Sequence, residues 1–222
     1  MDARAPPQRH GGAVPAAERA GPVRVTSAER EERPPIRVVL ADANVLYSRI
    51  LRDYLLYAAM GELIEIRWSS AILAEVVEHL SENIAGFDAA AGERLLAAMN
   101  GAFPEAEVEP GSDAAAAVAD IPLPDEDDRH VLAAAVSVDA DILCTDTLKD
   151  FPADTMGEVG IRLISADALL SLLCADFPHG MVAAHRLVVS RLPGATDDST
   201  FATLRRAGAP NAADSLASLL RG

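Results

Sequence analysis

From Ile36 to about residue 175, short runs of β-branched and aliphatic residues alternate with longer segments of helical periodicity. The short runs predict strands at residues 36–41, 64–69, 141–145 and 161–165. Each run is mostly apolar, as expected of strands that helices cover on both faces. Strands alternating with helices are typical of βαβ units, so the sequence predicts an α/β fold with a central parallel sheet.

The chain divides by composition and periodicity into three parts. Residues 1–35 are rich in Pro, Gly, Ala and Arg and show no periodicity, which predicts a disordered N-terminal arm. Residues 36–175 form the predicted α/β body. Residues 176–222 contain three helical patterns with no strand between them, and we expect this helical extension to pack on the body.

Half of the residues are hydrophobic, so the chain can bury a large core. No apolar run approaches the roughly eighteen residues that span a bilayer, and the N-terminus lacks the apolar region of a secretory signal. We therefore expect a cytoplasmic protein with no membrane segment. Cys144 and Cys174 lie in apolar segments without metal-site spacing, which predicts reduced, buried thiols.

The net charge of −15 is unevenly distributed along the sequence. Residues 36–175 hold 25 acidic and 8 basic residues, a net charge of −17. A broad acidic surface repels phosphate backbones, so the body is unlike a general nucleic-acid binder. A polyanionic substrate needs metal ions or local basic patches to approach it. Arg186, Arg191, Arg205 and Arg206 in the extension either steer such a substrate or form ordinary solvated helix faces.

The first predicted strand runs directly into Asp42, which Asn44 and Ser48 follow. In open α/β sheets, ligands bind at the carboxyl ends of the parallel strands, where Asp42 is expected to lie. Aspartate is also a common helix N-cap, and for Asp42 alone that interpretation is the stronger one. Convergence of further carboxylates is needed to favour a ligand site.

Other acidic residues are placed where they can converge with Asp42. Glu75 lies beside the apolar stripe of a predicted helix, whereas Glu78 and Glu82 fit a solvated face. The segment PDEDDRHVLAAA opens another helix with Asp125, Glu126, Asp127 and Asp128. Capping explains one or two of these acids, but four consecutive carboxylates repel one another unless a cation neutralises them.

The last acidic group follows the strand at residues 141–145, with Asp146 and Asp150. A site built from oxygen ligands alone favours Mg²⁺ or Mn²⁺ over zinc. Ions held by carboxylates activate water and counter the charge on a phosphate during in-line displacement. The pattern therefore indicates phosphodiester hydrolysis.

Four segments carry a resemblance to a known family: VVLADANVLYSRILRDYL, RWSSAILAEVV, PDEDDRHVLAAAV and DADILCTDTLKDFP. Their order and spacing resemble the PIN-domain ribonucleases, particularly the VapC-like toxins of toxin–antitoxin systems. The resemblance covers roughly residues 36–175, and the helical tail is more weakly similar to one subgroup of these toxins. It implies a three-layer α/β/α sandwich, Mg²⁺ or Mn²⁺ dependence, an RNA substrate, a homodimer and a cognate antitoxin.

The resemblance also implies roles for individual residues. Asp42 is the first metal-binding acid, supported by Asn44, Ser48 and Thr145. Glu75 is the acid on a helix. Asp128 is the acid four residues before Leu132, with Asp125 and Asp127 as substitutes.

At the fourth acidic position, this sequence departs from the family pattern. The usual motif after the fourth strand is T-x-D, but here Thr145 is followed two residues later by Thr147. Asp146 and Asp150 both remain candidates for the missing acid, and we rank Asp146 slightly ahead.

Three other classes of protein are weaker interpretations of the same sequence. A phosphoreceiver domain needs paired acids after the first strand and a lysine after the fifth, but Asp42 has alanine on both sides. A haloacid-dehalogenase-like phosphatase needs D-x-D, and Asn44 cannot act as the second acid. A PIN fold that binds a partner without cleaving RNA is a third alternative, favoured by the altered T-x-D motif.

Overall fold

The computed structural model describes residues 37–221, which belong to one compact unit, so the predicted arm at residues 1–35 lies outside the described residues. Within this part of the chain, all strands are parallel and form one sheet in the order β3-β2-β1-β4-β5. The strands are β1 (Arg37–Ala41), β2 (Ile64–Ser69), β3 (Glu107–Val108), β4 (Ile142–Cys144) and β5 (Arg162–Ile164).

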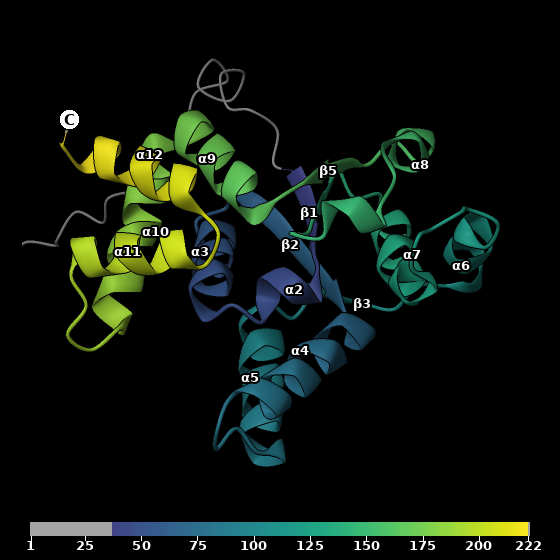
Figure 1. The fold of residues 1–222 in the computed structure, drawn as a ribbon, viewed down its shortest axis with the longest axis horizontal. Helices are drawn as coiled ribbons and strands as arrows, with labels where there is room; N and C mark the ends of the chain where they lie inside the picture. Colours follow the sequence, from purple (N-terminus) through teal and green to yellow (C-terminus); the bar gives the residue numbers. More distant parts are fainter. Residues whose placement is uncertain (1–36, 222) are drawn as a thin grey trace, which may run out of the picture. The chain divides into compact units, whose positions relative to one another are not determined.

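Helices cover both faces of this sheet. In Figure 1, α3 and α9 lie on one side of it, and α6, α7 and α8 lie on the other. The helices of the body are α2 (Ala43–Leu46), α3 (Arg49–Met60), α4 (Ser70–Asn83), α5 (Ala89–Ala102), α6 (Ser112–Val118), α7 (Arg129–Ser137), α8 (Ala153–Glu158) and α9 (Ala166–Asp176), with 3₁₀ turns η1 (Glu126–Asp128) and η2 (Leu148–Asp150). The predicted α/β/α sandwich with a parallel central sheet is confirmed.

The four predicted strands are confirmed to within one residue at each end. Three elements of the body were not predicted. The four-residue α2, the six-residue α8 and the two-residue β3 are too short to show a clear period. β3 is an edge strand, and it pairs with β2 through Trp68 and Ser69.

The core is built where the central strands meet the helices. The β1 residues Val39, Leu40 and Ala41 and the whole of β4 are fully buried, as a strand covered on both faces requires. Cys144 and Cys174 are free and buried, which confirms the expected reduced thiols. No helix within residues 37–221 is long and apolar enough to cross a membrane.

The C-terminal extension consists of three helices after α9, namely α10 (Pro178–Arg191), α11 (Asp197–Arg206) and α12 (Pro210–Arg221). α10 packs on α3, and α12 packs on α9 and α11. Gly180 allows α10 to approach the body closely, because a Cβ there would lie 2.7 Å from Leu63 Cδ2. The extension therefore shares a core with the body.

A buried histidine also joins the extension to the body. His185 of α10 is fully buried, and its Nδ1 lies 2.6 Å from the hydroxyl oxygen of Tyr54 in α3. Its Nε2 lies 3.2 Å from Asp197 Oδ1, and its ring stacks on Phe201 with centroids 4.8 Å apart. A neutral ring that accepts from Tyr54 and donates to Asp197 satisfies both nitrogens.

The strand order creates one switch point in the sheet. β1 pairs with β2 on one side and with β4 on the other. The strands β2 and β3 are therefore added on one side of β1, and β4 and β5 on the opposite side. Connections at such a point diverge and open a crevice beyond the carboxyl ends of the two strands. Asp42 follows β1 and Thr145 follows β4, so the fold brings them to this crevice.

Candidate active site

Asp42 is a buried carboxylate held by three hydrogen bonds. Only 4% of its surface is exposed. Its Oδ1 accepts from the backbone N of Ala43 at 2.6 Å, which makes it the N-cap of α2. Its Oδ2 accepts from the Asn44 amide and the Thr145 hydroxyl, each at 2.7 Å. Burial raises the pKa of Asp42, and these hydrogen bonds oppose the rise.

Asn44 joins the segment after β1 to the segment after β4. Besides Asp42, its Nδ2 contacts the hydroxyl oxygens of Thr145 at 2.8 Å and Thr147 at 3.0 Å. Its Oδ1 accepts from the backbone N of Asp146 at 2.9 Å. Because one amide uses both its donor and its acceptor across the crevice, the position of Asp42 is fixed relative to β4. Thr147, which the sequence marked only as a departure, is part of this network.

Five carboxylates line one cavity of about 290 Å³ at this crevice. We call it the acidic cavity, and its acids are Asp42, Glu75, Asp125, Asp128 and Asp150. The other side chains in its wall are Ala43, Asn44, Tyr47, His79 and Thr147. Among residues 37–221, no lysine or arginine belongs to this lining, so the described wall holds no fixed cation to balance these acids.

The acids come from separate elements. Glu75 lies on α4 with 44% of its side chain exposed. Asp128 ends η1 and occupies the N-cap position of α7 without a side-chain capping bond, whereas Asp125 caps η1 by accepting from Asp127 N at 3.0 Å. Burial raises the pKa of Asp128 to about 6, and the nearby charges of Asp42 and Asp150 add to the rise. The pKa of Glu75 is also raised, first by burial, while His130 opposes that rise.

His130 approaches the cavity from α7 without lining it. Its Nε2 lies 3.1 Å from Glu75 Oε1, although the contact is not aligned as a hydrogen bond. Its Nδ1 contacts the backbone oxygen of Asp127 at 2.7 Å. At this distance His130 can interact electrostatically with Glu75 from outside the cavity lining.

The two candidates for the fourth acid point to different places. The Asp146 carboxylate accepts from the backbone N of Ala166, at the start of α9, at 3.0 Å. It does not line the acidic cavity, whereas Asp150 does. Asp127 is also outside the lining. The structure thus brings together Asp42, Glu75, Asp125, Asp128 and Asp150, and it turns Asp146 toward α9.

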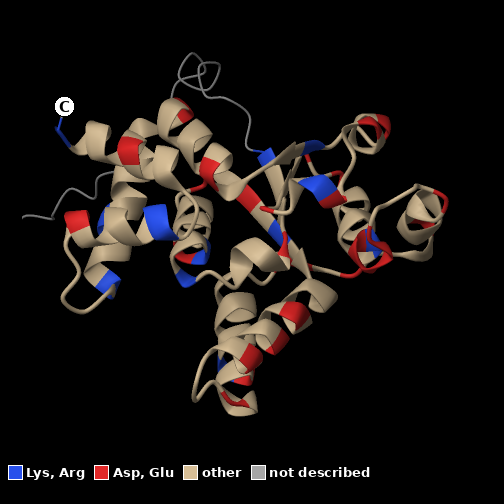
Figure 2. Cartoon of the chain, in the orientation of Figure 1, with Lys and Arg blue, Asp and Glu red and all other residues tan. Residues whose placement is uncertain are grey.

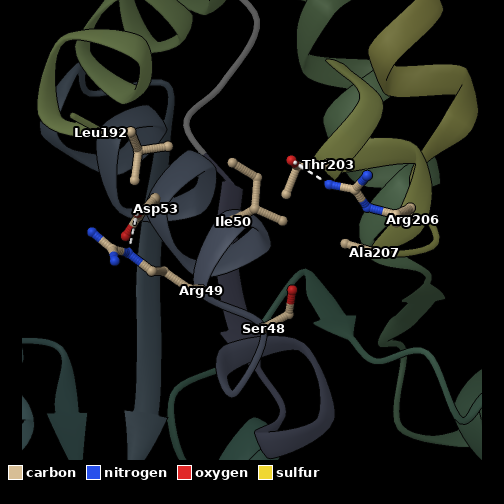
Figure 3. Close-up of a pocket in the computed structure, with 8 residues that line it drawn as sticks. All are labelled: Ser48, Arg49, Ile50, Asp53, Leu192, Thr203, Arg206 and Ala207. Carbon is tan, nitrogen blue, oxygen red and sulfur yellow. Dashed lines mark hydrogen bonds and ion pairs between the residues drawn. The ribbon is translucent and has the colours of Figure 1, made fainter. Parts of the chain in front are cut away.

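Ser48 was predicted to support Asp42, but it lies on another cavity. It is the residue before α3, and its side chain makes no capping hydrogen bond. Figure 3 shows Ser48 with Ile50 of α3 and Arg206 of α11 around a cavity of about 360 Å³. Within the described residues it makes no hydrogen bond to Asp42. Of the three predicted supports, Asn44 and Thr145 donate hydrogen bonds to Asp42.

The donors of the acidic cavity fit a hard divalent cation. Carboxylate, amide and hydroxyl oxygens surround it, and the excess negative charge is uncompensated. Among residues 37–221, no three His, Cys, Asp or Glu side chains already converge as a closed metal cluster. Ions such as Mg²⁺ keep several waters and use few protein ligands, so an open acidic wall is compatible with one.

Charge is also sorted around the cavity. Figure 2 shows acidic residues along α4 and α5, and basic residues at the start of α3 and in α10 and α11. Of the arginines in α11, Arg205 pairs with Asp214, and Arg206 donates to Thr203 Oγ1. Arg206 also lines the cavity of Figure 3. Arg129 and Lys149 are the chain neighbours of the cavity acids Asp128 and Asp150, although neither lines the cavity.

A parallel α/β sheet with an acidic crevice beyond its carboxyl edge belongs to the class of α/β folds that can hold a catalytic divalent cation at that edge. The comparison with protein families agrees, since residues 37–149 match the PIN domain model, slightly more than half of the chain. The chain belongs to the PIN domain family. PIN domains are in general nucleases, which implies a nucleic acid substrate.

The family match includes Asp42, Glu75 and Asp128, and it ends one residue before Asp150. The helices α8 to α12 lie beyond it. Searches of curated proteins and of solved structures found no match.

Proposed function

We propose that this protein is an endoribonuclease that hydrolyses RNA phosphodiester bonds with bound Mg²⁺ or Mn²⁺. The observation that carries the proposal is the acidic cavity, in which five carboxylates meet at the switch point without a lysine or arginine in the lining. Such a wall repels an RNA phosphate, and it becomes a useful site only when a cation offsets its charge.

Asp42, Glu75 and Asp128 are the proposed metal-holding acids. A divalent cation bound there would lower the pKa of a water molecule and counter the charge on the scissile phosphate. Asn44 and Thr145 orient Asp42 through their hydrogen bonds of 2.7 Å to its Oδ2. Burial and the neighbouring carboxylates raise the pKa of Asp128 to about 6 in the metal-free chain, and a bound cation would lower it again.

For the fourth acidic position, we now propose Asp150 ahead of Asp146. The support is that Asp150 shares the cavity wall, while the Asp146 carboxylate is occupied by Ala166 N. Thr147 stands in the wall where the family motif has its aspartate, so this side of the site carries less charge than the motif implies.

The biological role we propose is that of a VapC-like toxin, acting in the cytoplasm as a homodimer and silenced by a cognate antitoxin. The motif around Asp42 and the helical tail support this role, since both resemble that subgroup. A small DNA-binding protein encoded beside this gene, forming a complex that blocks RNA cleavage, is the expected finding. An isolated gene with no inhibitory neighbour would remove the toxin role and leave the nuclease.

The decisive experiment is RNA cleavage by the purified full chain, with Mn²⁺ or Mg²⁺ and with EDTA. Wild-type protein should cleave only with the metal, and Asp42→Asn should remove cleavage while the circular dichroism spectrum stays unchanged. Asp176→Asn is a matched control, because Asp176 pairs with Arg37 outside the cavity. Wild-type cleavage activity in Asp42→Asn would contradict the proposal.

A binding-only PIN protein is the second candidate. It is favoured by Thr147 and by the outward turn of Asp146, which leave the fourth acid outside its motif position. Failure of the wild-type protein to cleave a varied RNA pool in Mn²⁺, together with measurable RNA or protein binding, would select this candidate.

A further inference from the structure

A second cavity of about 510 Å³ adjoins the acidic cavity, and we call it the groove. Its principal residues are Tyr47, Arg49 and Arg52 from the α2–α3 segment and His79, Ile84 and Phe87 from α4 and the following loop. Tyr47 and His79 line both cavities, so the two are adjacent and share a wall. Most of the groove wall is apolar, in contrast with the carboxylates next door.

An aromatic pair stands at the junction of the two cavities. The rings of Tyr47 and His79 have centroids 4.2 Å apart and an interplanar angle of 44°. Tyr47 is 38% exposed, and Ile84 further along the groove is 52% exposed. Exposed aromatic and aliphatic groups that line a cavity offer a stacking surface for a flat ring.

The groove also contains a buried guanidinium without a carboxylate partner. Arg52 is only 9% exposed, and its Nη1 donates to the backbone oxygen of Leu46 at 2.6 Å. No ion pair of Arg52 is found within the described residues. The adjacent Asp53 pairs instead with Arg49, with 3.7 Å between Nε and Oδ2. Asp53 offsets the charge of Arg52 only from beyond ion-pair distance, and a buried guanidinium of this kind beside a cavity points to an anionic ligand.

We propose that the groove binds the nucleotide next to the scissile phosphate of a single-stranded RNA, with its base against Tyr47 and His79 and its phosphate on Arg49 and Arg52. This inference rests on the proposed nuclease function. The wall that the groove shares with the acidic cavity favours a substrate strand that passes from one to the other. Charge favours it too, because Arg49 and Arg52 are the arginines that adjoin this part of a strongly acidic body.

The same arrangement gives selectivity for single strands. A base can reach an apolar groove only when it is unpaired and turned out of a stack. Every base has a flat face, so stacking holds the strand with little sequence preference, while the arginines hold its backbone. The groove then provides favourable contacts with RNA, whereas the negative charge of the acidic cavity opposes RNA binding.

The test measures dissociation constants for fluorescent single-stranded RNA of about ten nucleotides, in Ca²⁺, with one abasic position moved along the strand. For the wild-type full chain, one abasic position should weaken binding about ten-fold. Tyr47→Ala should weaken binding of intact RNA about ten-fold and lose sensitivity to that abasic position. Such a non-additive result means that the base and the tyrosine contact each other.

Arginine variants test the phosphate contact. Arg49→Ala should weaken binding and reduce its salt dependence, because one phosphate contact is lost. Arg52→Lys should also weaken binding, because the planar guanidinium is lost, but it keeps the positive charge and should leave the salt dependence nearly unchanged. Arg49 is 68% exposed, so Arg49→Ala still tests the phosphate contact if the buried position 52 does not tolerate change. The controls are Arg162→Ala, on the exposed first residue of β5, and Leu187→Ala, whose side chain is as exposed as Tyr47.

If the fold-loss in RNA affinity from the two changes together equals the product of the separate losses from Tyr47→Ala and from the abasic position, the base and the tyrosine do not interact, and the inference is overturned. Wild-type protein that binds no RNA would also overturn it. A Tyr47→Ala protein that keeps its RNA affinity but changes its oligomeric state would do the same, because the groove would then bind a second copy of the chain. Cleavage in Mn²⁺ is measured separately. If the protein cleaves RNA but the two affinity losses are independent, only the inference about the groove fails. If the losses are non-additive but no RNA is cleaved, only the proposed hydrolysis fails.

Discussion

Two buried polar clusters in this protein differ in how fully they are satisfied. The His185 cluster joins α10 to α3 and α11, and each ring nitrogen has one complementary partner, Tyr54 or Asp197. In the acidic cavity, the Asp42 oxygens are satisfied as well, but four more carboxylates line the same wall, and the described lining holds no lysine or arginine.

The difference shows what each cluster can be used for. A fully paired polar network adds rigidity and specifies one packing arrangement. A network with surplus like charge costs stability, and it is retained where a ligand supplies the missing counter-charge. If this difference holds, substitutions in the acidic cavity should affect RNA cleavage, whereas substitutions in the His185 cluster should affect stability.

Asn44→Asp is expected to have the largest effect, because it places a second carboxylate where an amide donates to Asp42 at 2.7 Å. The free energy of unfolding at pH 8 should fall by about 3–5 kcal/mol, as for an uncompensated buried charge. RNA cleavage should fall about 10–100-fold. Chemical denaturation and cleavage rates measure the two effects.

The matched control for this change is Asn211→Asp. Asn211 also donates to a carboxylate, Asp167 Oδ2, at 2.7 Å, but it lies on the exposed surface. Solvent screening should limit its cost to less than about 1 kcal/mol. Equal losses at the two positions would contradict the special role of the buried cluster.

His185→Ala should lower the free energy of unfolding by about 2–4 kcal/mol, because it opens a cavity and leaves the Tyr54 hydroxyl without its partner. RNA cleavage per folded molecule should stay within about two-fold of wild type. Urea unfolding and cleavage at a temperature where the variant remains folded measure these quantities. A strong loss of cleavage with unchanged stability would give the His185 cluster a functional role and remove the contrast.

Asp150→Asn and Asp146→Asn form a pair that tests which acid serves the cavity. Asp150→Asn should reduce cleavage about ten-fold, since it removes charge from the cavity wall. Asp146→Asn should leave cleavage nearly unchanged, because its oxygen can still accept from Ala166 N. Cleavage rates measured over a range of Mn²⁺ concentrations separate weaker metal binding from slower chemistry, and the reverse ranking would restore Asp146.

Much of the fold was predictable from local sequence patterns. The strand and helix periods fixed β1, β2, β4 and β5, and the parallel order then brought the segments after β1 and β4 to one edge. Glu75 was also predictable as a wall residue, because it precedes Val76 of the apolar stripe by one position. These inferences needed only periodicity and the geometry of parallel sheets.

Other parts of the site depended on contacts distant in sequence. Asp146 turns away because of Ala166, which follows it by twenty residues. Ser48 faces another cavity because α2 ends at Leu46 and α3 begins at Arg49, a break too short to show in the pattern. The groove arises where Tyr47 meets His79, and neither residue carries a local signal for it.

The smallest expected effect is a pH dependence of stability that belongs to His185. Burial lowers the pKa of His185 below its ordinary value of 6.5, although the bond to Asp197 opposes this shift. The unfolded chain therefore binds this proton more readily than the folded chain. The contribution of His185 to stability is complete above pH 6.5, and it is lost as the pH falls from there through the folded-state pKa.

Urea unfolding of wild type and His185→Gln at pH 7.5 and pH 5.5 isolates this contribution. The glutamine cannot titrate, so the variant should lose less stability than wild type between the two pH values. The acidic cavity titrates identically in both proteins and cancels from the difference. An equal loss in wild type and variant would mean that folding leaves the pKa of His185 unchanged. A smaller loss in wild type than in the variant would mean that folding raises this pKa, and the His185 cluster would then carry an ion pair with Asp197 in place of a neutral, fully paired network.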